Sequence, residues 1–426
     1  MKYGFPYDYL SWLDIPDDNL IGIFEAGQEK PSSPPDAVIR RALDDPVGAP
    51  MLSDIAGEVE RVLILCDDNT RYTPAHLVLP HILGDLRHGG LSDDRIGILI
   101  ASGTHRTMTG DELIAKLGKA VVERFAIEQH THDDTDELVS TGKRLKDVEF
   151  LVNRRLQDAD LVIGVGNIVP HMYKGFSGGS NIILPGVSWE NSIGAMHWLT
   201  LETPLDKILG VRDNPIRALN DEVARRAGLN YIVNTIVNND METLDVVAGD
   251  PVDAHRKGAE IASRVFIVDI PEKADIVIFD AYKNDRDFWQ ANKGLNPAFI
   301  CMKPGGVIIM VAGCPEGVCH NIPDIGRYGF RDMDTVMELY DKGMLHPIVA
   351  HFLLATHHIV AKHGRCISVT RGISREQAEH IGFIYAETPQ DALEKAFSMK
   401  GHDASITVLR HAGTICPRLS NTRARR

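Results

Sequence analysis

One local pattern recurs along this chain: a short, continuously apolar run, then a polar loop, then a helical pattern. The apolar runs are Val62–Cys66, Arg95–Ala101 and Leu161–Asn167. Continuous apolar runs are typical of strands covered on both faces. A helical pattern follows the first run over 75–87, and Thr109–Glu112 after the second has the spacing of a capping box. Such a series predicts right-handed βαβ units and a mainly parallel sheet.

The length of 426 residues is too great for one simple core, so we expect two domains. A second α/β series begins at Asp275–Phe279, and a boundary is plausible at 269–274. We therefore predict an N-terminal domain over 1–270 and a C-terminal α/β domain over 271–404. The late strand Ser405–Leu409 could return to the first domain, which 405–426 would then complete. The expected class is α/β, with two domains, each having a mainly parallel sheet flanked by helices.

Charge and composition exclude several classes of partner. The net charge of -14 argues against a nucleic-acid groove, which needs a basic surface. No apolar stretch reaches the roughly 20 residues of a membrane span, and the start of the sequence lacks the features of a signal peptide. The six cysteines are scattered, unlike a secreted disulfide framework. These features favour a cytoplasmic protein.

Polar side chains that could bind a ligand or take part in catalysis follow each predicted strand. Asp68, Thr70 and Arg71 follow the first run, His105 the second and His171 the third. Arg71 suits a carboxylate or a phosphate, while Asp68 and Thr70 could bind ribose hydroxyls. The plainer alternative is a capped turn with a solvated arginine. The two histidines suit acid–base chemistry, although a lone loop histidine is more often structural.

Glycines and a lysine extend the His171 loop. The segment 171–181 includes Lys174 and Ser177-Gly178-Gly179, and ligands bind at such strand ends in open α/β sheets. Glycine lets the backbone approach a ligand closely, and successive N–H groups can bind an anion. This segment is therefore a candidate binding loop.

Two further positions carry weaker signals. His197 could be a packed histidine against Trp198 or a metal ligand, since imidazole binds nickel, zinc and copper. The chain has no H-E-x-x-H motif and no paired C-x-x-C motif. Gln290 and Lys293 are three residues apart and share a face if helical; they could hold a carboxylate or be a routine polar pair.

Taken together and in order, these motifs resemble the lactate racemase family, the nickel-pincer nucleotide enzymes. The resemblance covers most of the chain from about Leu63 onward. The matching positions are Asp68-x-Thr70-Arg71, Ser102-Gly-Thr-His105, His171-x-x-x-Gly-Phe-Ser-Gly-Gly179, Pro185-Gly186, His197, Asn214-Pro215 and Gln290-x-x-Lys293.

The resemblance implies a racemase or epimerase of 2-hydroxy acids, which is an isomerase. It also implies that the N-terminal domain is catalytic and binds the cofactor, and that the active site lies in the interdomain cleft. His197 would bind the nickel of a pincer nucleotide, and His105 and His171 would be the acid–base pair. Hydride would leave the substrate carbon and return to its other face. Cofactor-synthesis enzymes would be needed in the host, and an oligomer is possible. The implied substrate-binding residues are Arg71, Gln290, Lys293 and Trp289; the implied cofactor-binding residues are Asp68, Thr70, Lys174, Ser177, Gly178, Gly179 and Asn181.

Two departures from the family pattern shape the expectation. Asn181 stands where the family has a lysine joined covalently to the cofactor, so we expect non-covalent binding; Lys174 lies seven residues earlier. Trp289 replaces a frequent tyrosine, which favours a 2-hydroxy acid other than lactate. Two alternatives stay open: a metal-assisted hydrolase using His105, His171 and His197, and a non-catalytic protein that binds a nucleotide or a carboxylate.

Overall fold

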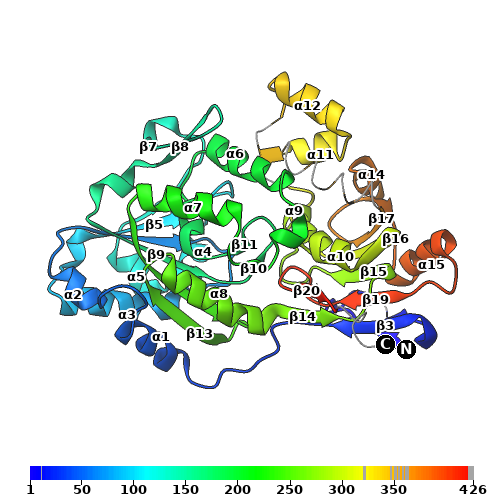
Figure 1. Ribbon diagram of the computed structural model, residues 1–426, viewed down its shortest axis with the longest axis horizontal. Helices are drawn as coiled ribbons and strands as arrows, with labels where there is room; N and C mark the ends of the chain where they lie inside the picture. Colours follow the sequence, from blue (N-terminus) through cyan, green and yellow to red (C-terminus); the bar gives the residue numbers. More distant parts are fainter. Residues whose placement is uncertain are drawn as a thin grey trace. The chain divides into compact units, whose positions relative to one another are not determined.

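The computed structural model (Figure 1) describes the chain apart from Ser11 and several later segments. The segments outside the description are 320–322, 346–347, 350–352, 354–355, 357–358, 360–363 and 421–426. The chain divides into two compact units: unit 1 comprises Met1–Gly27 and Phe266–Arg426, and unit 2 comprises Gln28–Val265.

Unit 2 is built on a six-stranded sheet with the order β13-β12-β9-β4-β5-β6. Neighbouring strands are parallel except for the antiparallel pair β12 and β13. The strands are β4 (Val62–Asp67), β5 (Ile96–Ala101), β6 (Ile127–Gln129), β9 (Leu161–Asn167), β12 (Leu229–Val237) and β13 (Thr243–Gly249). The three strands expected from apolar runs are confirmed as β4, β5 and β9. Every residue of β4 and β9 is buried, as predicted for strands covered on both faces.

Helices pack on both faces of this sheet because successive side chains of a strand point to opposite sides. On one face, Val62, Ile64 and Cys66 of β4 join a core cluster with residues of α1–α5. On the other face the backbone at Gly164 lies against Ile182, whose Cγ2 is 2.8 Å from where a Cβ would stand. The predicted capping box at Thr109 and Glu112 opens α4. The helices of unit 2 are α1 (Pro35–Asp44), α2 (Leu52–Ala56), α3 (Ala75–His88), α4 (Gly110–Leu117), α5 (Lys119–Arg124), α6 (Glu190–Leu201), α7 (Pro215–Arg226) and α8 (Asp253–Phe266).

Two small hairpins extend unit 2 beyond its main sheet. Strands β7 (Leu138–Leu145) and β8 (Val148–Asn153) pair antiparallel, and so do β10 (Pro170–His171) and β11 (Gly175–Phe176). The second hairpin lies just beyond β9 in the chain and places His171 at the start of its turn.

Unit 1 contains a second six-stranded sheet, all of whose neighbouring strands are parallel. Its order is β18 (Ile384–Tyr385), β17 (Gly364–Thr370), β16 (Met302–Ala312), β15 (Ala274–Asp280), β19 (Ile406–Leu409) and β3 (Leu20–Phe24). Short pairs join β1 (Lys2–Tyr3) to β2 (Leu13–Asp14) and β14 (Ile267–Ile270) to β20 (Cys416–Leu419). Among the described residues the helices are α9 (Phe288–Ala291), α10 (Leu295–Cys301), α11 (Asp324–Tyr328), α12 (Met333–Asp341), α14 (Arg375–His380) and α15 (Pro389–Lys400). The expected α/β class, with parallel-rich sheets flanked by helices, is confirmed.

The compact units divide the chain differently from the boundaries expected at 1–270, 271–404 and 405–426. The change of unit falls at Phe266, close to the expected boundary, but the first 27 residues belong to unit 1. Strand β19 pairs with β15 and β3, so the late strand joins the C-terminal sheet rather than returning to the first domain. The reason is that β19 and β3 extend the apolar sheet begun by β15; residues 421–426 lie outside the described residues.

None of the helices in the described part of the chain is long and apolar enough to cross a membrane.

Candidate active site

Three neighbouring strands bring the predicted residues of unit 2 to one edge of its sheet. Strand β4 pairs in parallel with β5 on one side and with β9 on the other. The carboxyl ends of parallel strands meet at the same edge, and Asp68, His105 and His171 follow β4, β5 and β9 respectively. In open α/β sheets this is the edge at which ligands bind.

A buried ion pair fixes the turn after β4. Nζ of Lys116 in α4 lies 2.7 Å from Oδ1 of Asp67, and the same amine donates to the carbonyl of Arg71 at 3.0 Å. The hydroxyl of Thr73 donates to the other oxygen of Asp67. The Asp68–Arg71 turn is therefore held from beneath by side chains that sequence reasoning did not identify.

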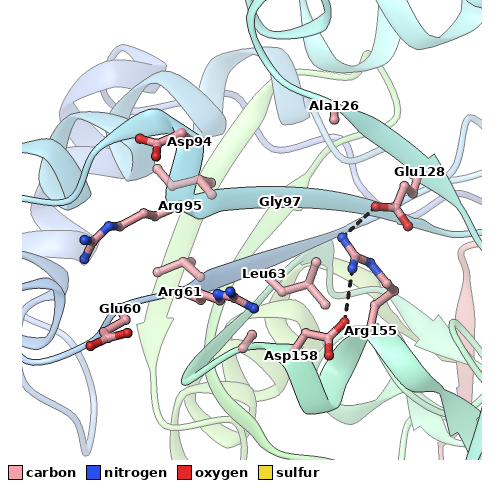
Figure 2. A pocket seen from close by; sticks show the side chains of 13 residues that line it. Glu60, Arg61, Leu63, Asp94, Arg95, Gly97, Ala126, Glu128, Arg155 and Asp158 are labelled. Carbon is pink, nitrogen blue, oxygen red and sulfur yellow. Dashed lines mark hydrogen bonds and ion pairs between the residues drawn. The ribbon is translucent and has the colours of Figure 1, made fainter.

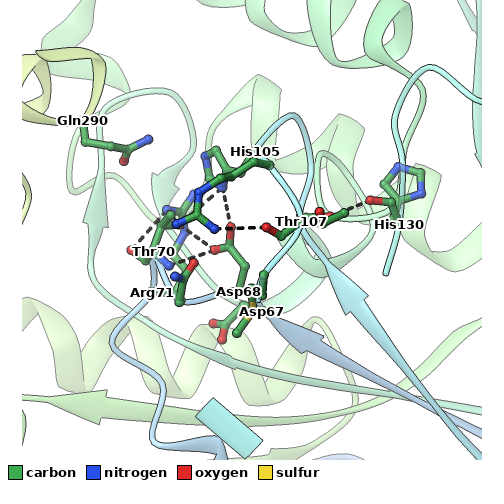
Figure 3. A network of polar contacts seen from close by, with 12 residues as sticks. Asp67, Asp68, Thr70, Arg71, His105, Thr107, His130 and Gln290 are labelled. Carbon is green, nitrogen blue, oxygen red and sulfur yellow. Dashed lines mark hydrogen bonds and ion pairs between the residues drawn. The ribbon is translucent and has the colours of Figure 1, made fainter. Parts of the chain in front are cut away.

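Asp68 and His105 form the central contact of this edge. Nδ1 of His105 lies 2.7 Å from Oδ2 of Asp68, and the hydroxyl of Thr70 donates to Oδ1 of Asp68 at 2.6 Å (Figure 3). Burial alone raises the pKa of Asp68, but His105, Arg71 and Thr70 together outweigh it and hold the pKa well below its usual range. The carboxylate therefore stays ionised and orients the imidazole.

Arg71 lies over the same turn. Its Nη1 donates to the hydroxyl of Thr70 at 2.8 Å, which links the guanidinium to Asp68 through one side chain (Figure 3). The turn itself closes with a hydrogen bond from the Arg71 amide to the Asp68 carbonyl at 3.1 Å. The plainer alternative of a capped turn is thus part of the answer, since Asp68 also accepts the Thr70 amide at 3.1 Å.

His171 is oriented by the backbone of its own hairpin. The amide of Tyr173 donates to Nδ1 of His171 at 3.2 Å. The ring of Tyr173 is close to two imidazoles, with centroids 5.9 Å from His171 and 5.0 Å from His197. Sequence reasoning missed Tyr173; its only signal was an aromatic residue two positions after a candidate catalytic histidine.

Lys174, the next residue in the hairpin, is 2% exposed. Its Nζ donates to the carbonyl of Leu184 at 2.9 Å, and the amide of Asn220 donates to the same carbonyl at 2.7 Å. Burial holds the pKa of Lys174 far below its ordinary value, and the nearby cations Arg217 and Arg71 lower it further. The amine is therefore disfavoured as an ammonium ion.

The glycine loop is held mainly by protein contacts on its inner side. Gly178 and Gly179 have φ of 74° and 57°, and a Cβ on Gly179 would stand 2.8 Å from Cδ2 of His255. The amide of Gly179 donates to Asn234 at 2.6 Å, and the amide of Ser177 donates to the Val169 carbonyl at 2.8 Å. Close packing therefore explains these glycines, and at least two of the loop N–H groups bind protein acceptors rather than an anion.

Arg217 of α7 supports the same loop and was not identified from sequence. This guanidinium is 4% exposed and donates to the carbonyls of Phe176 and Gly178 and to the hydroxyl of Ser180. Ser180 in turn donates to Asp221 at 2.6 Å. The side chain of Asn181 accepts a hydrogen bond from Asn220 at 3.2 Å, so it also belongs to this network.

His197 lies on α6 with its ring half-buried beside Tyr173. The described residues contain no group of three or more His, Cys, Asp or Glu side chains that could hold a metal ion. His105, His171 and His197 are thus not arranged as three ligands of one ion. A metal ion bound at His197 would therefore need donors other than such a group of side chains, and imidazole is a common ligand of nickel, zinc and copper.

Gln290, Lys293 and Trp289 belong to unit 1, where α9 and the following 3-10 turn carry them. Nζ of Lys293 donates to Oε1 of Gln290 at 2.6 Å, which confirms that the two side chains share a face. Asp287 caps the helix through the Gln290 amide at 2.7 Å.

A pocket of about 500 Å³ lies at the opposite, amino-terminal edge of the unit 2 sheet (Figure 2). The positive charges of its arginines and the negative charges of its acidic side chains nearly cancel. Arg155 donates to Glu128 at 2.8 Å and to Asp158 at 3.1 Å. The pocket is remote in the fold from Asp68 and His105, which follow the carboxyl ends of the strands, so we do not assign the chemistry to it.

The sheet edge of unit 2 defines a class of protein: an α/β enzyme that carries an oriented imidazole and a cation at the strand ends. Comparison with known proteins gives the family. The family model for the lactate racemase N-terminal domain matches residues 8–208, and that for the lactate racemase C-terminal domain matches 270–415. The chain belongs to the lactate racemase family and is an enzyme of the isomerase class.

Relatives and solved structures agree with this assignment. The lactate racemase of Lactiplantibacillus plantarum is 29% identical over 419 residues, covering 95% of this chain and 96% of that protein. The lactate racemase of Thermoanaerobacterium thermosaccharolyticum is 29% identical over 411 residues, covering 93% and 94%. The structure of the apoprotein of a T. thermosaccharolyticum lactate racemase matches with a TM-score of 0.88 and 27% identity, over 98% of this chain and all of that one. A Thermotoga maritima protein shares the fold, with a TM-score of 0.69 and 21% identity over 88% of this chain.

Proposed function

We propose that this chain is a racemase or epimerase of a 2-hydroxy acid that uses a nickel-pincer nucleotide. The observation that carries the proposal is the 2.7 Å contact of Asp68 with His105 at the carboxyl edge of the sheet, in a member of the lactate racemase family. A carboxylate that orients an imidazole prepares it to accept a proton from a substrate hydroxyl.

Each proposed residue has a physical task. His105 and His171 exchange the hydroxyl proton on the two sides of the substrate, and Arg71 neutralises the substrate carboxylate. Lys293, whose amine donates to Gln290, would bind the same carboxylate, a role that rests on the family resemblance. When bound, the nickel group supplies a hydride acceptor and donor. His197 would bind its metal, and Asp68, Thr70, Lys174, Ser177, Gly178, Gly179 and Asn181 would line its place.

We further propose that the cofactor is held without a covalent bond. Asn181 carries an amide, which cannot form the link made by a lysine amine, and it is engaged with Asn220. Intact-protein mass measured under denaturing conditions tests this. Loss of the cofactor mass on unfolding is expected, whereas a retained mass would contradict the proposal and direct attention to Lys174.

The substrate is proposed to be a 2-hydroxy acid other than lactate. Trp289 brings an indole to a position where the family often has tyrosine, which should reshape the substrate pocket. The test is co-expression with the cofactor-synthesis enzymes, followed by nickel analysis and a chiral screen that includes lactate, aromatic, branched and sugar acids. Lactate as the best substrate would refute this part of the proposal.

Variants test the site assignments with two readouts. Replacement of His105 or His171 by alanine is expected to abolish turnover while nickel stays bound, and His197→Ala is expected to lose nickel first. Full activity in all three variants would overturn the site.

The rival functions receive less support. A metal-assisted hydrolase needs His105, His171 and His197 on one ion, an arrangement that the described residues do not show. No specific observation favours a non-catalytic protein that binds a nucleotide or a carboxylate. The proposal also includes a cytoplasmic location and a need for cofactor-synthesis enzymes in the host. It leaves room for an oligomer.

A further inference from the structure

The two histidines of the site make opposite contacts at the same ring atom. Nδ1 of His105 faces an ionised carboxylate oxygen of Asp68 at 2.7 Å, and a carboxylate can only accept. Nδ1 of His171 faces the backbone amide of Tyr173 at 3.2 Å, and an amide N–H can only donate. Nδ1 must therefore carry a proton in His105 and a lone pair in His171.

These contacts fix opposite tautomers. A neutral imidazole has one N–H and one lone pair, so the state of Nδ1 determines the state of Nε2. The lone pair of neutral His105 lies on Nε2, whereas neutral His171 carries its proton on Nε2. Thr70 agrees with this assignment, because its hydroxyl donates to Asp68 and lies 3.4 Å from Nδ1 of His105 as an acceptor.

We propose that the resting enzyme is asymmetric: His105 is a ready base, and His171 is a ready hydrogen-bond donor whose tautomer the Tyr173 amide holds. This inference rests on the proposed function for its kinetic consequence, but not for the tautomers themselves. Asp68 and the Tyr173 amide are positioning groups that act through the two rings.

The consequence differs for the two enantiomers of the substrate. An enantiomer whose hydroxyl meets His105 can give its hydroxyl proton directly to Nε2 of that ring, as its oxidation to a 2-oxo acid requires. An enantiomer whose hydroxyl meets His171 is first bound by an N–H. Before His171 can act as a base at Nε2, the proton on Nε2 must leave and another proton must bind Nδ1, so the ring stays neutral. The hydrogen bond from the Tyr173 amide to Nδ1 is then lost.

Thermodynamics restricts how this asymmetry can be seen. For a substrate with a single stereocentre the two forms are enantiomers of equal free energy, so kcat/KM must be equal in the two directions. The enantiomer on the His171 side should therefore have a lower KM and a lower kcat by the same factor. One extra hydrogen bond to the bound substrate corresponds to about threefold to tenfold.

The decisive experiment is a nitrogen–proton correlation spectrum of the apoprotein labelled with [¹⁵N]histidine. The signals are assigned by their loss in His105→Gln and His171→Gln. We expect a protonated Nδ1 for neutral His105 and a protonated Nε2 for neutral His171. The same tautomer in both rings, or the reverse pair, would overturn the inference.

Two variants separate the positioning groups from general structure. Asp68→Asn should move the proton of neutral His105 to Nε2 and leave the His171 signals in place. Tyr173→Phe keeps the backbone amide and should leave both tautomers unchanged; a changed His171 would show that the phenol, not the amide, sets its state. Because the spectra need no turnover, a protein that racemises nothing would refute the proposed function without touching the tautomers. If turnover is found, equal KM values for the two enantiomers would refute the kinetic asymmetry.

Discussion

Lys116 and Asp67 form an ion pair inside unit 2, directly beneath the turn that carries Asp68 and Arg71. Their side chains are 6% and 11% exposed, and 2.7 Å separates Nζ from Oδ1. The pair joins α4 to the end of β4, and the amine also binds the carbonyl of Arg71. This buried ion pair therefore supports the edge of the sheet, and removing either partner would leave the other charge buried without its counterion.

Loss of one partner should therefore be costly. Lys116→Met leaves the Asp67 carboxylate buried without its cation and removes a donor from Arg71, so a destabilisation of about 3–5 kcal/mol is expected. Urea unfolding measures it. In the double variant Lys116→Met/Asp67→Asn no charge is stranded, and most of the loss should be recovered; additive losses would argue against the pair.

Asp68→Asn tests the orientation of His105 without removing the ring. An asparagine amide can donate to Nδ1 and so stabilise the wrong tautomer, as in serine proteases in which the same exchange lowers kcat by about 10⁴. We expect a fall in kcat on the order of 10²–10⁴, expressed per bound nickel so that any effect of Asp68 on cofactor binding is measured separately. In a His105→Gln background the same exchange should add little; an independent loss there would mean that Asp68 acts elsewhere.

Gly179 should tolerate no side chain, for two separable reasons. Its φ of 57° costs an L-residue about 1–2 kcal/mol, and an added Cβ would stand 2.8 Å from His255. Overpacking typically adds 1–3 kcal/mol, so Gly179→Ala should cost about 2–5 kcal/mol in thermal or urea unfolding. Gly228 is the matched control, since its φ is 87° and nothing lies within 4 Å of a Cβ there. Equal losses at both positions would show that packing against His255 is unimportant.

Much of this edge could be predicted from the sequence because local patterns encode it. The apolar runs gave β4, β5 and β9, and the residues that follow them reached one edge because parallel strands align their ends. Asn214 and Pro215 open α7, with the asparagine side chain accepting from the Ile216 and Arg217 amides. Gln290 and Lys293 met because three residues make almost one helical turn.

Contacts between distant segments were beyond such reasoning. Nothing local to Leu20–Phe24 reveals that this strand joins β19 almost 400 residues later. The partner of His105 was overlooked for a similar reason: Asp68 was assigned to ribose hydroxyls or a cap, and only the register of β4 and β5 brings it to the imidazole. Tyr173 acts on His171 through its backbone amide, which every residue except proline possesses, so an aromatic residue at this position did not indicate that contact.

Acid should weaken the fold through His130. This histidine is 1% exposed, and its ring contacts the Ser188 carbonyl at 3.1 Å and the Asn153 amide at 3.2 Å. Burial lowers its pKa to about 4, so above pH ~6.5 the folded and unfolded states are both neutral there. As the pH falls from about 6.5 to about 4, the unfolded state binds the proton first, and about 3 kcal/mol of stability is lost.

The pH dependence can be assigned to this residue by comparison. The free energy of unfolding, measured by urea at pH 7 and pH 5, should fall less steeply in His130→Gln than in the unmodified protein. His255 is also buried with a lowered pKa, so some slope should remain. An unchanged slope in His130→Gln would contradict the assignment.

Lys174 is expected to lower the stability of the folded apoprotein. The unfolded chain carries an ammonium at pH 7, whereas burial disfavours that charge in the fold and leaves one hydrogen bond, to Leu184. Asn220 still satisfies that carbonyl when the amine is gone. Lys174→Met should therefore stabilise the apoprotein at pH 7 by roughly 1–4 kcal/mol. Because the pKa is lowered in the fold, raising the pH toward 10 should favour the native lysine and narrow the gap.

A side chain that destabilises its own fold indicates a functional reason for its presence. Lys174→Met should accordingly bind less nickel cofactor than the unmodified protein, although it is the more stable apoprotein. Lys257→Met is the matched control, because Lys257 is exposed in the same unit and its replacement should change stability by less than about 0.5 kcal/mol. Urea unfolding of the apoproteins and nickel content of the loaded proteins give the two readouts. A Lys174→Met protein that is less stable at pH 7 would show that the lysine serves the fold, and undiminished nickel would remove it from the cofactor site.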